Sequence, residues 1–339
     1  MRDRLDISLR ANHVLFAILF MAALVFGMLA SLTGERFYLR LATEALILSG
    51  LALSIDILLG FTGLLSLGQA LYFGVGAYVS ALVLSNIPSF WLAMAAATGA
   101  SMVAGILGGL IANRVRGVYF ALITFGMAQI AAKIVYNTRA LGASDGMIGI
   151  PMVEIPLGIA TLSAGNPLEF FLVVLAVITL IYAGMSYVLG TPFGRVMIAL
   201  KANEKRVPYL GYSTWAPRMV AYVLAAVIAG TVGGLYPMLR GFVSPELMFF
   251  SASGDALIMV IVGGTGTLVG AIWGAILLVL FKSVVGSLTE HHLILVGMMF
   301  MAAVLFMQRG LIGLVKPSIE RRLLRLEASR TTREEGNAP

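Results

Sequence analysis

Long apolar segments, each near the length of a membrane-spanning helix, make up most of this 339-residue chain. About 20 apolar residues in a helix cross the hydrocarbon core of a bilayer, where backbone groups must find their hydrogen-bond partners within the protein. Hydrophobic residues make up 60% of the chain and charged residues only 12%, whereas a soluble domain carries about 25% charged residues. The sequence therefore predicts an all-α, polytopic transmembrane helical bundle.

The predicted bundle has about ten spans, with eight to ten possible. The predicted spans are residues 14–32, 42–60, 64–84, 91–113, 117–136, 168–189, 218–240, 268–283 and 292–308. Residues 246–263 are ambiguous, because Glu246, Ser251, Ser253 and Asp255 precede an apolar run. This segment is either a span with a polar face or an external helix with a re-entrant piece.

The distribution of Lys and Arg favours an even number of spans. With both termini on one side, that side collects the bases of residues 1–13, Arg114, Arg116, the five bases from Arg195 to Arg218 and the basic tail 309–339. Basic loops stay preferentially in the cytoplasm. We therefore expect a cytoplasmic N-terminus at 1–13, a transmembrane domain at 14–308 with a cytoplasmic loop at 190–217, and a cytoplasmic tail at 309–339.

Two glycine-containing segments resemble one another at a constant offset of 203 residues. Residues 55–63 (IDILLGFTG) align with residues 258–266 (IMVIVGGTG). The same offset aligns residues 14–32 with residues 217–235. Transporters often contain two related halves, with the transport site near glycine-interrupted helices. The sequence predicts two related halves, although chance matching in so apolar a chain is the alternative.

Signatures of enzymes and of metal or nucleic-acid binding are not recognisable. The chain has no G-x-x-x-x-G-K-[ST] phosphate loop, no H-E-x-x-H and no cysteine, so we expect no ATP hydrolysis, no metal site and no catalytic residue in it. The net charge of +7 follows from basic loops and termini, not from nucleic-acid binding. An intramembrane enzyme is therefore the least favoured interpretation.

Asp56 is the carboxylate most enclosed by apolar sequence. It either binds a cation, as in an ion-coupled secondary carrier for small organic solutes, or caps the backbone interrupted near Gly60. Thr62 and Thr265 adjoin the interruptions, where a hydroxyl satisfies freed backbone groups or faces a pathway. Tyr119 near a span end is a further candidate for the pathway, or an interfacial anchor.

A polar segment at 191–206, between two apolar spans, is predicted to be a basic helix of about four turns. Thr191 is placed to cap it, Pro192 to open it and Pro208 to stop it. In a chain without a nucleotide motif, such a segment suits the attachment of a soluble partner.

Five blocks of sequence resemble the permease subunits of branched-chain amino acid ABC importers, in particular the longer of their two paired permeases. The blocks are GLLSLGQA with FGVGAY at 63–78, RGVYFA with Thr124 at 116–124, SDG through GIP at 144–151, PFGR through Asn203-Glu204 at 192–204, and GFVSPE with GGTGTL at 241–268. They follow one another in order over roughly residues 40–310.

The resemblance implies a heteromeric importer in the plasma (inner) membrane of a bacterium or archaeon. Its expected partners are a second permease, two ATP-binding cassette subunits that use ATP and Mg, an external solute-binding protein and the lipid bilayer. This chain itself would bind no cofactor. The resemblance also implies transport by alternating access of branched-chain or related small hydrophobic amino acids. Related permeases for urea, amides or small organic acids are the alternative within the family.

The resemblance and the glycine pattern together assign roles to three groups of residues. Those expected to couple the permease to an ATPase are Phe193, Gly194, Arg195, Lys201, Asn203 and Glu204. Those expected at the pathway or its hinges are Gly60, Thr62, Gly63, Ser66, Gly68, Tyr119, Phe120, Thr124, Gly263, Gly264, Thr265 and Gly266. Those of the external loop are Ser144, Asp145 and Gly146.

Overall fold

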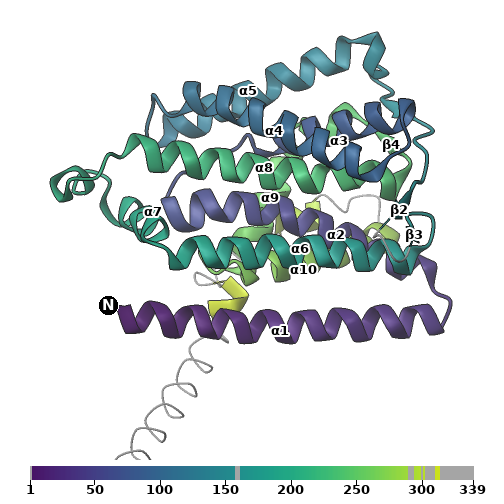
Figure 1. Cartoon of the computed structure of the whole chain (residues 1–339), viewed down its shortest axis with the longest axis horizontal. Helices are drawn as coiled ribbons and strands as arrows, with labels where there is room; N and C mark the ends of the chain where they lie inside the picture. The colour runs from purple at the N-terminus through teal and green to yellow at the C-terminus, as the bar shows by residue number, and fades with distance from the viewer. Residues whose placement is uncertain (1, 157–160, 289–293, 299–300, 302–309, 314–339) are drawn as a thin grey trace, which may run out of the picture.

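The computed structural model describes residues 2–156, 161–288, 294–298, 301 and 310–313. Long helices run side by side through the described part (Figure 1). The helices are α1 (Arg2–Leu32), α2 (Arg36–Asp56), α3 (Gln69–Asn86), α4 (Phe90–Ala112), α5 (Val118–Asn137), α6 (Pro167–Gly190), α7 (Pro192–Asn203), α8 (Trp215–Arg240), α9 (Phe250–Gly263) and α10 (Val269–Leu288). The prediction of an all-α fold is confirmed.

Seven helices in the described residues are long and apolar enough to cross a membrane. They comprise residues 11–32 of α1, α2 together with the π-helical turn η1 (Ile57–Thr62), and α4, α5, α6, α8 and α10. The predicted span 64–84 is helical only from Gln69, and α9 within 246–263 has 14 residues. Most of the predicted span 292–308 and most of the tail 309–339 lie outside the described residues. A total of ten spans therefore stays a prediction.

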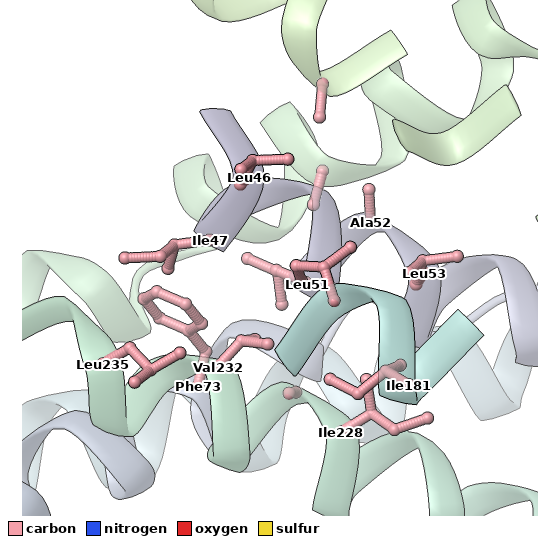
Figure 2. Close-up of a cluster of buried hydrophobic side chains, with 14 of the residues drawn as sticks. Leu46, Ile47, Leu51, Ala52, Leu53, Phe73, Ile181, Ile228, Val232 and Leu235 are labelled. Carbon is pink, nitrogen blue, oxygen red and sulfur yellow. The ribbon is translucent and has the colours of Figure 1, made fainter. Parts of the chain in front are cut away.

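Helix α2 lies inside the bundle. It packs against α6, α8, α9 and α10. In the most apolar 18-residue stretch of Arg36–Thr62, 89% of the residues are buried. Figure 2 shows side chains of α2, including Leu51, beside Phe73 of α3, Ile181 of α6 and Val232 of α8. A helix that is apolar on every side is expected to be buried in this way.

Close contact between α3 and α8 depends on glycine. A Cβ built on Gly76 would lie 2.7 Å from Gly230 Cα, and one built on Gly233 would lie 3.0 Å from Phe73 Cα. Small residues let the backbones of membrane helices meet, which replaces the hydrophobic driving force that lipid does not supply. These glycines therefore fix the spacing of the two helices.

Short strands lie at the end of the bundle opposite α7 and the N-terminus (Figure 1). Strand β1 (Met147–Ile148) pairs antiparallel with β4 (Phe242–Val243), and β2 (Glu154–Pro156) pairs with β3 (Thr161–Ser163). The first pair brings together the predicted loop at 144–151 and the block at 241–246, which are far apart in the sequence. Three short 3₁₀ helices complete the described elements: η2 (Arg139–Leu141), η3 (Val207–Leu210) and η4 (Pro245–Met248).

Candidate coupling and translocation site

The first helix interruption follows Asp56 at the end of α2. The chain makes the π-helical turn η1, adopts a left-handed conformation at Gly63 (φ +75°) and becomes helical again only at Gln69. Thr62 Oγ1 donates to the carbonyl of Leu58 over 2.6 Å, and the N–H of Leu64 donates to the same oxygen over 2.9 Å. The hydroxyl of Thr62 is thus bonded to the backbone of the interruption itself.

The second interruption separates α9 from α10. Gly264 (φ +118°), Gly266 (φ +76°) and Leu268 (φ +55°) have positive φ angles, so the chain cannot continue as a right-handed helix there. Thr267 Oγ1 donates to Gly264 O and accepts from Gly270 N, at 2.8 and 3.0 Å. Thr265 is exposed, in contrast to its counterpart Thr62, which is 4% exposed.

The two interruptions are joined by the carboxylate of Asp56. Its Oδ1 accepts the N–H of Gly266 over 2.6 Å, and its Oδ2 accepts the N–H of Leu268 over 3.0 Å. Asp56 is fully buried. A Cβ on Gly60 would lie 2.7 Å from Gly266 Cα and would also overlap the Asp56 carboxylate. Asp56 therefore caps a backbone interruption, but the second one, at Gly266 and Leu268, and not the one at Gly60.

Helix α7 begins as the sequence predicts. Thr191 Oγ1 accepts the N–H of Gly194 over 3.4 Å, and Pro192 occupies the first turn. The helix ends at Asn203, whose Oδ1 accepts the N–H of Lys205 over 3.1 Å. It is thus shorter than the predicted run to Arg206, and Pro208 lies in the separate turn η3. The side chain of Asn203 turns the chain before the proline is reached.

Lys201 connects α7 to the first interruption. Its Nζ donates to the carbonyl of Gly60 over 2.6 Å, a carbonyl within the π-helical turn. A Cβ on Gly63 would lie 3.3 Å from both Cα and Cγ of Lys201. The structure thus places the predicted coupling residue Lys201 directly on the predicted hinge residues Gly60 and Gly63.

Glu204 faces the permease itself. Its Oε1 accepts from Arg218 of α8 over 3.0 Å and lies 3.2 Å from Nε of Arg116. The Arg218 side chain is 4% exposed, and its second guanidinium nitrogen donates to Val115 O over 2.7 Å. The sequence analysis did not single out Arg218 as a site residue; its only signal was a base at the start of an apolar span.

A groove lies along α7. Its lining residues are Pro192, Arg195, Val196, Ala199, Val207 and Tyr212. Arg195 is exposed and Phe193 is half-buried, whereas Gly194 is buried against the backbone of α6. Of the predicted coupling residues, Arg195 is therefore the one available to a partner in this groove.

The non-helical stretch before α3 packs against α5. Thr124 Oγ1 accepts the N–H of Leu67 over 3.1 Å, and Gly68 lies against the backbone of Thr124. Ser66 Oγ accepts from the Gln69 amide over 3.3 Å. Ser253 of α9, which the sequence analysis noted only for its polarity, accepts the N–H of Ala70 over 3.1 Å.

The two aromatic residues predicted near the pathway have different surroundings. Phe120 is 1% exposed and packs edge-on against Tyr222, with ring centroids 5.8 Å apart. Tyr119 is 71% exposed. Phe120 thus belongs to the core, and only Tyr119 is accessible from outside the described bundle.

The residues of the predicted external loop form a tight turn. Ser144 Oγ donates to Asp145 Oδ1 over 3.1 Å, and both residues are exposed. Gly146 has φ +74° and leaves no room for a Cβ beside the carbonyl of Val243. The loop is therefore held to β4.

Within the described residues no group of three or more His, Cys, Asp or Glu side chains is arranged to hold a metal ion.

Comparison with known proteins decides the family. The family model described as "Branched-chain amino acid transport system / permease component" matches residues 37–304. The chain belongs to this permease family. It is therefore a transporter permease subunit and not an enzyme, and the predicted family is confirmed.

Individual relatives agree with the family. The permease is 28% identical to the high-affinity branched-chain amino acid transport system permease protein LivM of Salmonella typhimurium, over 88% of this chain and 76% of that protein. LivM of Escherichia coli is 27% identical over 83% and 71% of the two chains. The autoinducer 2 import system permease protein LsrC of Yersinia pseudotuberculosis is 29% identical over 81% and 77%. No solved structure matches the chain.

Proposed function

We propose that this chain forms half of the translocation pathway of an ATP-driven importer for branched-chain amino acids. Its partners are a second permease, two ATPase subunits that use ATP and Mg, and an external solute-binding protein. The proposal places the assembly in an inner membrane, with both termini and α7 on the cytoplasmic side. Its mechanism is alternating access, in which the two interruptions change their contacts while the long helices stay intact.

The hydrogen bond from Lys201 to Gly60 carries the coupling part of this proposal. Movement of α7 by an ATPase bound in the groove would act on Gly60, where the π-helical turn already departs from regular α-helix. From there, Asp56 extends the connection to Gly266 and Leu268 of the second interruption. One short path of three polar contacts thus joins α7 to both halves of the permease.

The Glu204–Arg218 pair supports a second attachment of α7. Arg218 is in the first turn of α8, so displacement of Glu204 would move the end of a long helix that packs on α3 and α4. We therefore assign Glu204 to transmission within the permease and Arg195 to contact with the ATPase. Ser144, Asp145 and Gly146, at the far end of the bundle, are proposed to face the solute-binding protein.

An ion-coupled carrier that uses Asp56 is the competing function. The geometry disfavours it, because both carboxylate oxygens already accept backbone N–H groups. The two N–H groups already compensate the buried carboxylate, so it needs no cation to be stable there. Leucine uptake by this chain in proteoliposomes with an ion gradient but without ATPase subunits would establish the carrier instead.

The coupling path is tested with Lys201→Met in the reconstituted complex. This variant keeps an unbranched side chain and removes the donor to Gly60. We expect the number of ATP molecules hydrolysed per leucine imported to rise about tenfold, as an energetic coupling of about 1–3 kcal/mol would give. Lys205→Met, two residues past the end of α7, is the matched control. An unchanged ratio in Lys201→Met would remove this contact from the coupling path.

A further inference from the structure

An ion pair joins α9 to α10 at a distance from both interruptions. Asp255 Oδ2 and Lys282 Nζ are 2.5 Å apart, and their side chains are 34% and 29% exposed. At 1.5 Å of rise per residue, Asp255 lies about 12 Å along α9 from Gly263, and Lys282 about 20 Å along α10 from Val269. The pair is thus well away from the contact between Asp56 and Gly266.

Small or polar residues neighbour the pair along its own helix faces. Ser251, one turn before Asp255, and Gly286, one turn after Lys282, are both exposed on the same helix faces as the charges. Charged groups inside a membrane are costly and almost always face a water-filled cavity or the interior of a bundle, where they mark substrate or ion pathways. The path from Lys201 to Gly266 uses neither of these charges.

We infer that Asp255 and Lys282 bind the head group of the transported amino acid. In this arrangement the α-ammonium group pairs with Asp255, and the α-carboxylate pairs with Lys282. Ile258, one turn along α9 and half-buried, offers apolar contact to the aliphatic side chain. The inference rests on the proposed function, since it gives the amino acid a binding position within the permease.

Charge complementarity is the physical reason for this assignment. Without a ligand, the two side chains neutralise one another. A zwitterion replaces one ion pair by two, so neither side chain is left as an unpaired charge. A ligand with only an ammonium or only a carboxylate group separates the pair and leaves one charge unpaired, which is strongly unfavourable where water is scarce. An ion pair therefore selects amino acids against both amines and acids of the same shape.

Direct binding to the purified complex, without the solute-binding protein, tests the inference. Radiolabelled leucine is the probe, and 3-methylbutan-1-amine and 4-methylpentanoate are the competitors with one charge each. In the native complex, we expect leucine to compete at least about tenfold better than either analogue, the effect of one lost charged hydrogen bond. Asp255→Asn and Lys282→Gln should each weaken leucine binding about tenfold or more.

The two variants should also differ in selectivity. Asp255→Asn removes the partner of the ammonium group, so discrimination against 4-methylpentanoate should fall. Lys282→Gln removes the partner of the carboxylate, so discrimination against 3-methylbutan-1-amine should fall. A change in helix packing alone would not produce these opposite preferences.

Glu44→Gln provides the matched control. It breaks another 2.5 Å ion pair, between Glu44 of α2 and Arg240 of α8, and should leave leucine binding within about twofold of native. Native leucine binding and selectivity in both Asp255→Asn and Lys282→Gln would overturn the inference. A second outcome would also overturn it: the variants lose the second permease during purification, while the complexes that stay intact bind leucine with native affinity. The pair would then belong to the subunit interface.

The proposed function fails separately from this inference. If the native complex shows no ATP-dependent uptake of leucine, the transport function itself is refuted. Native uptake together with unchanged affinity in both variants would refute only the role of Asp255 and Lys282.

Discussion

Asp56 Oδ1 accepts the backbone N–H of Gly266, 210 positions later, over 2.6 Å in the interior of the bundle. The two residues come from the two segments that resemble one another in sequence, so the interruptions meet directly. A carboxylate that accepts two backbone N–H groups stabilises a non-helical backbone that lipid or apolar side chains could not satisfy. This contact connects local sequence, bundle architecture and the proposed mechanism.

Asp56→Asn should destabilise the permease although it preserves the shape of the side chain. The amide oxygen can accept one of the two N–H groups, but the NH₂ group then faces the other donor. A buried donor without a partner costs about 1–3 kcal/mol. We expect a lower melting temperature of the detergent-solubilised permease and looser coupling of ATP hydrolysis to uptake. A variant as stable as native would show that the carboxylate is dispensable to the interruption.

Cysteine substitution should distinguish the two equivalent threonines. The chain has no cysteine, so a single Thr265→Cys or Thr62→Cys variant carries one thiol. Thr265 is exposed and Thr62 is 4% exposed. We expect a bulky maleimide to label position 265 in the native state and to label position 62 only after denaturation, as read from gel mobility. Equal labelling of both would contradict this arrangement of the interruptions.

Glu204→Gln should be more damaging than Arg116→Met. Removal of the carboxylate leaves the buried Arg218 cation without its charged partner, and because the Glu204 side chain is 26% exposed, we expect a cost below the about 3–5 kcal/mol of a fully buried pair. Arg116 is 62% exposed at the side chain, and exposed pairs contribute about 0–1 kcal/mol. Thermal denaturation of the two purified variants measures the difference. If the order is reversed, Arg218 is not the residue that holds Glu204.

Arg195→Glu should weaken attachment of the ATPase. Arg195 lies in the groove on α7 and is exposed, so a reversed charge acts on the partner without disturbing the core. We expect at least about tenfold less ATPase to co-purify with the variant, as for a charge that contributes to docking. Lys205→Glu makes the same charge change outside the groove and serves as the control. Equal loss in both would indicate a general charge effect.

Gly76→Ala should disturb the packing of α3 on α8. Its Cβ would lie 2.7 Å from Gly230 Cα, whereas a Cβ on Gly126 of α5 would meet no atom within 4 Å. Overpacking of a tight contact costs about 1–3 kcal/mol. We expect Gly76→Ala to lower the melting temperature and Gly126→Ala to leave it nearly unchanged. Comparable melting temperatures would mean that the two helices can separate at little cost.

The sequence by itself determined the class of the protein, its family and the position of its interruptions. Hydrophobic length predicts membrane helices because the bilayer has a fixed thickness, and glycine at Gly63 and Gly266 predicts interruptions because its φ angle is unrestricted. The cap at Thr191 could also be predicted, because capping is a local interaction. The end of α7 was placed too late, since Asn203 stops the helix before Pro208 does.

Only the tertiary structure decided which residues act together. Asp56 with Gly266, Lys201 with Gly60, Glu204 with Arg218 and Asp255 with Lys282 are each contacts between different segments. Hydropathy and propensity depend on neighbours along the chain, so they cannot give such pairs. The cost of a bare polar group in an apolar interior makes these contacts necessary, but the packing of helices determines which partner each group finds.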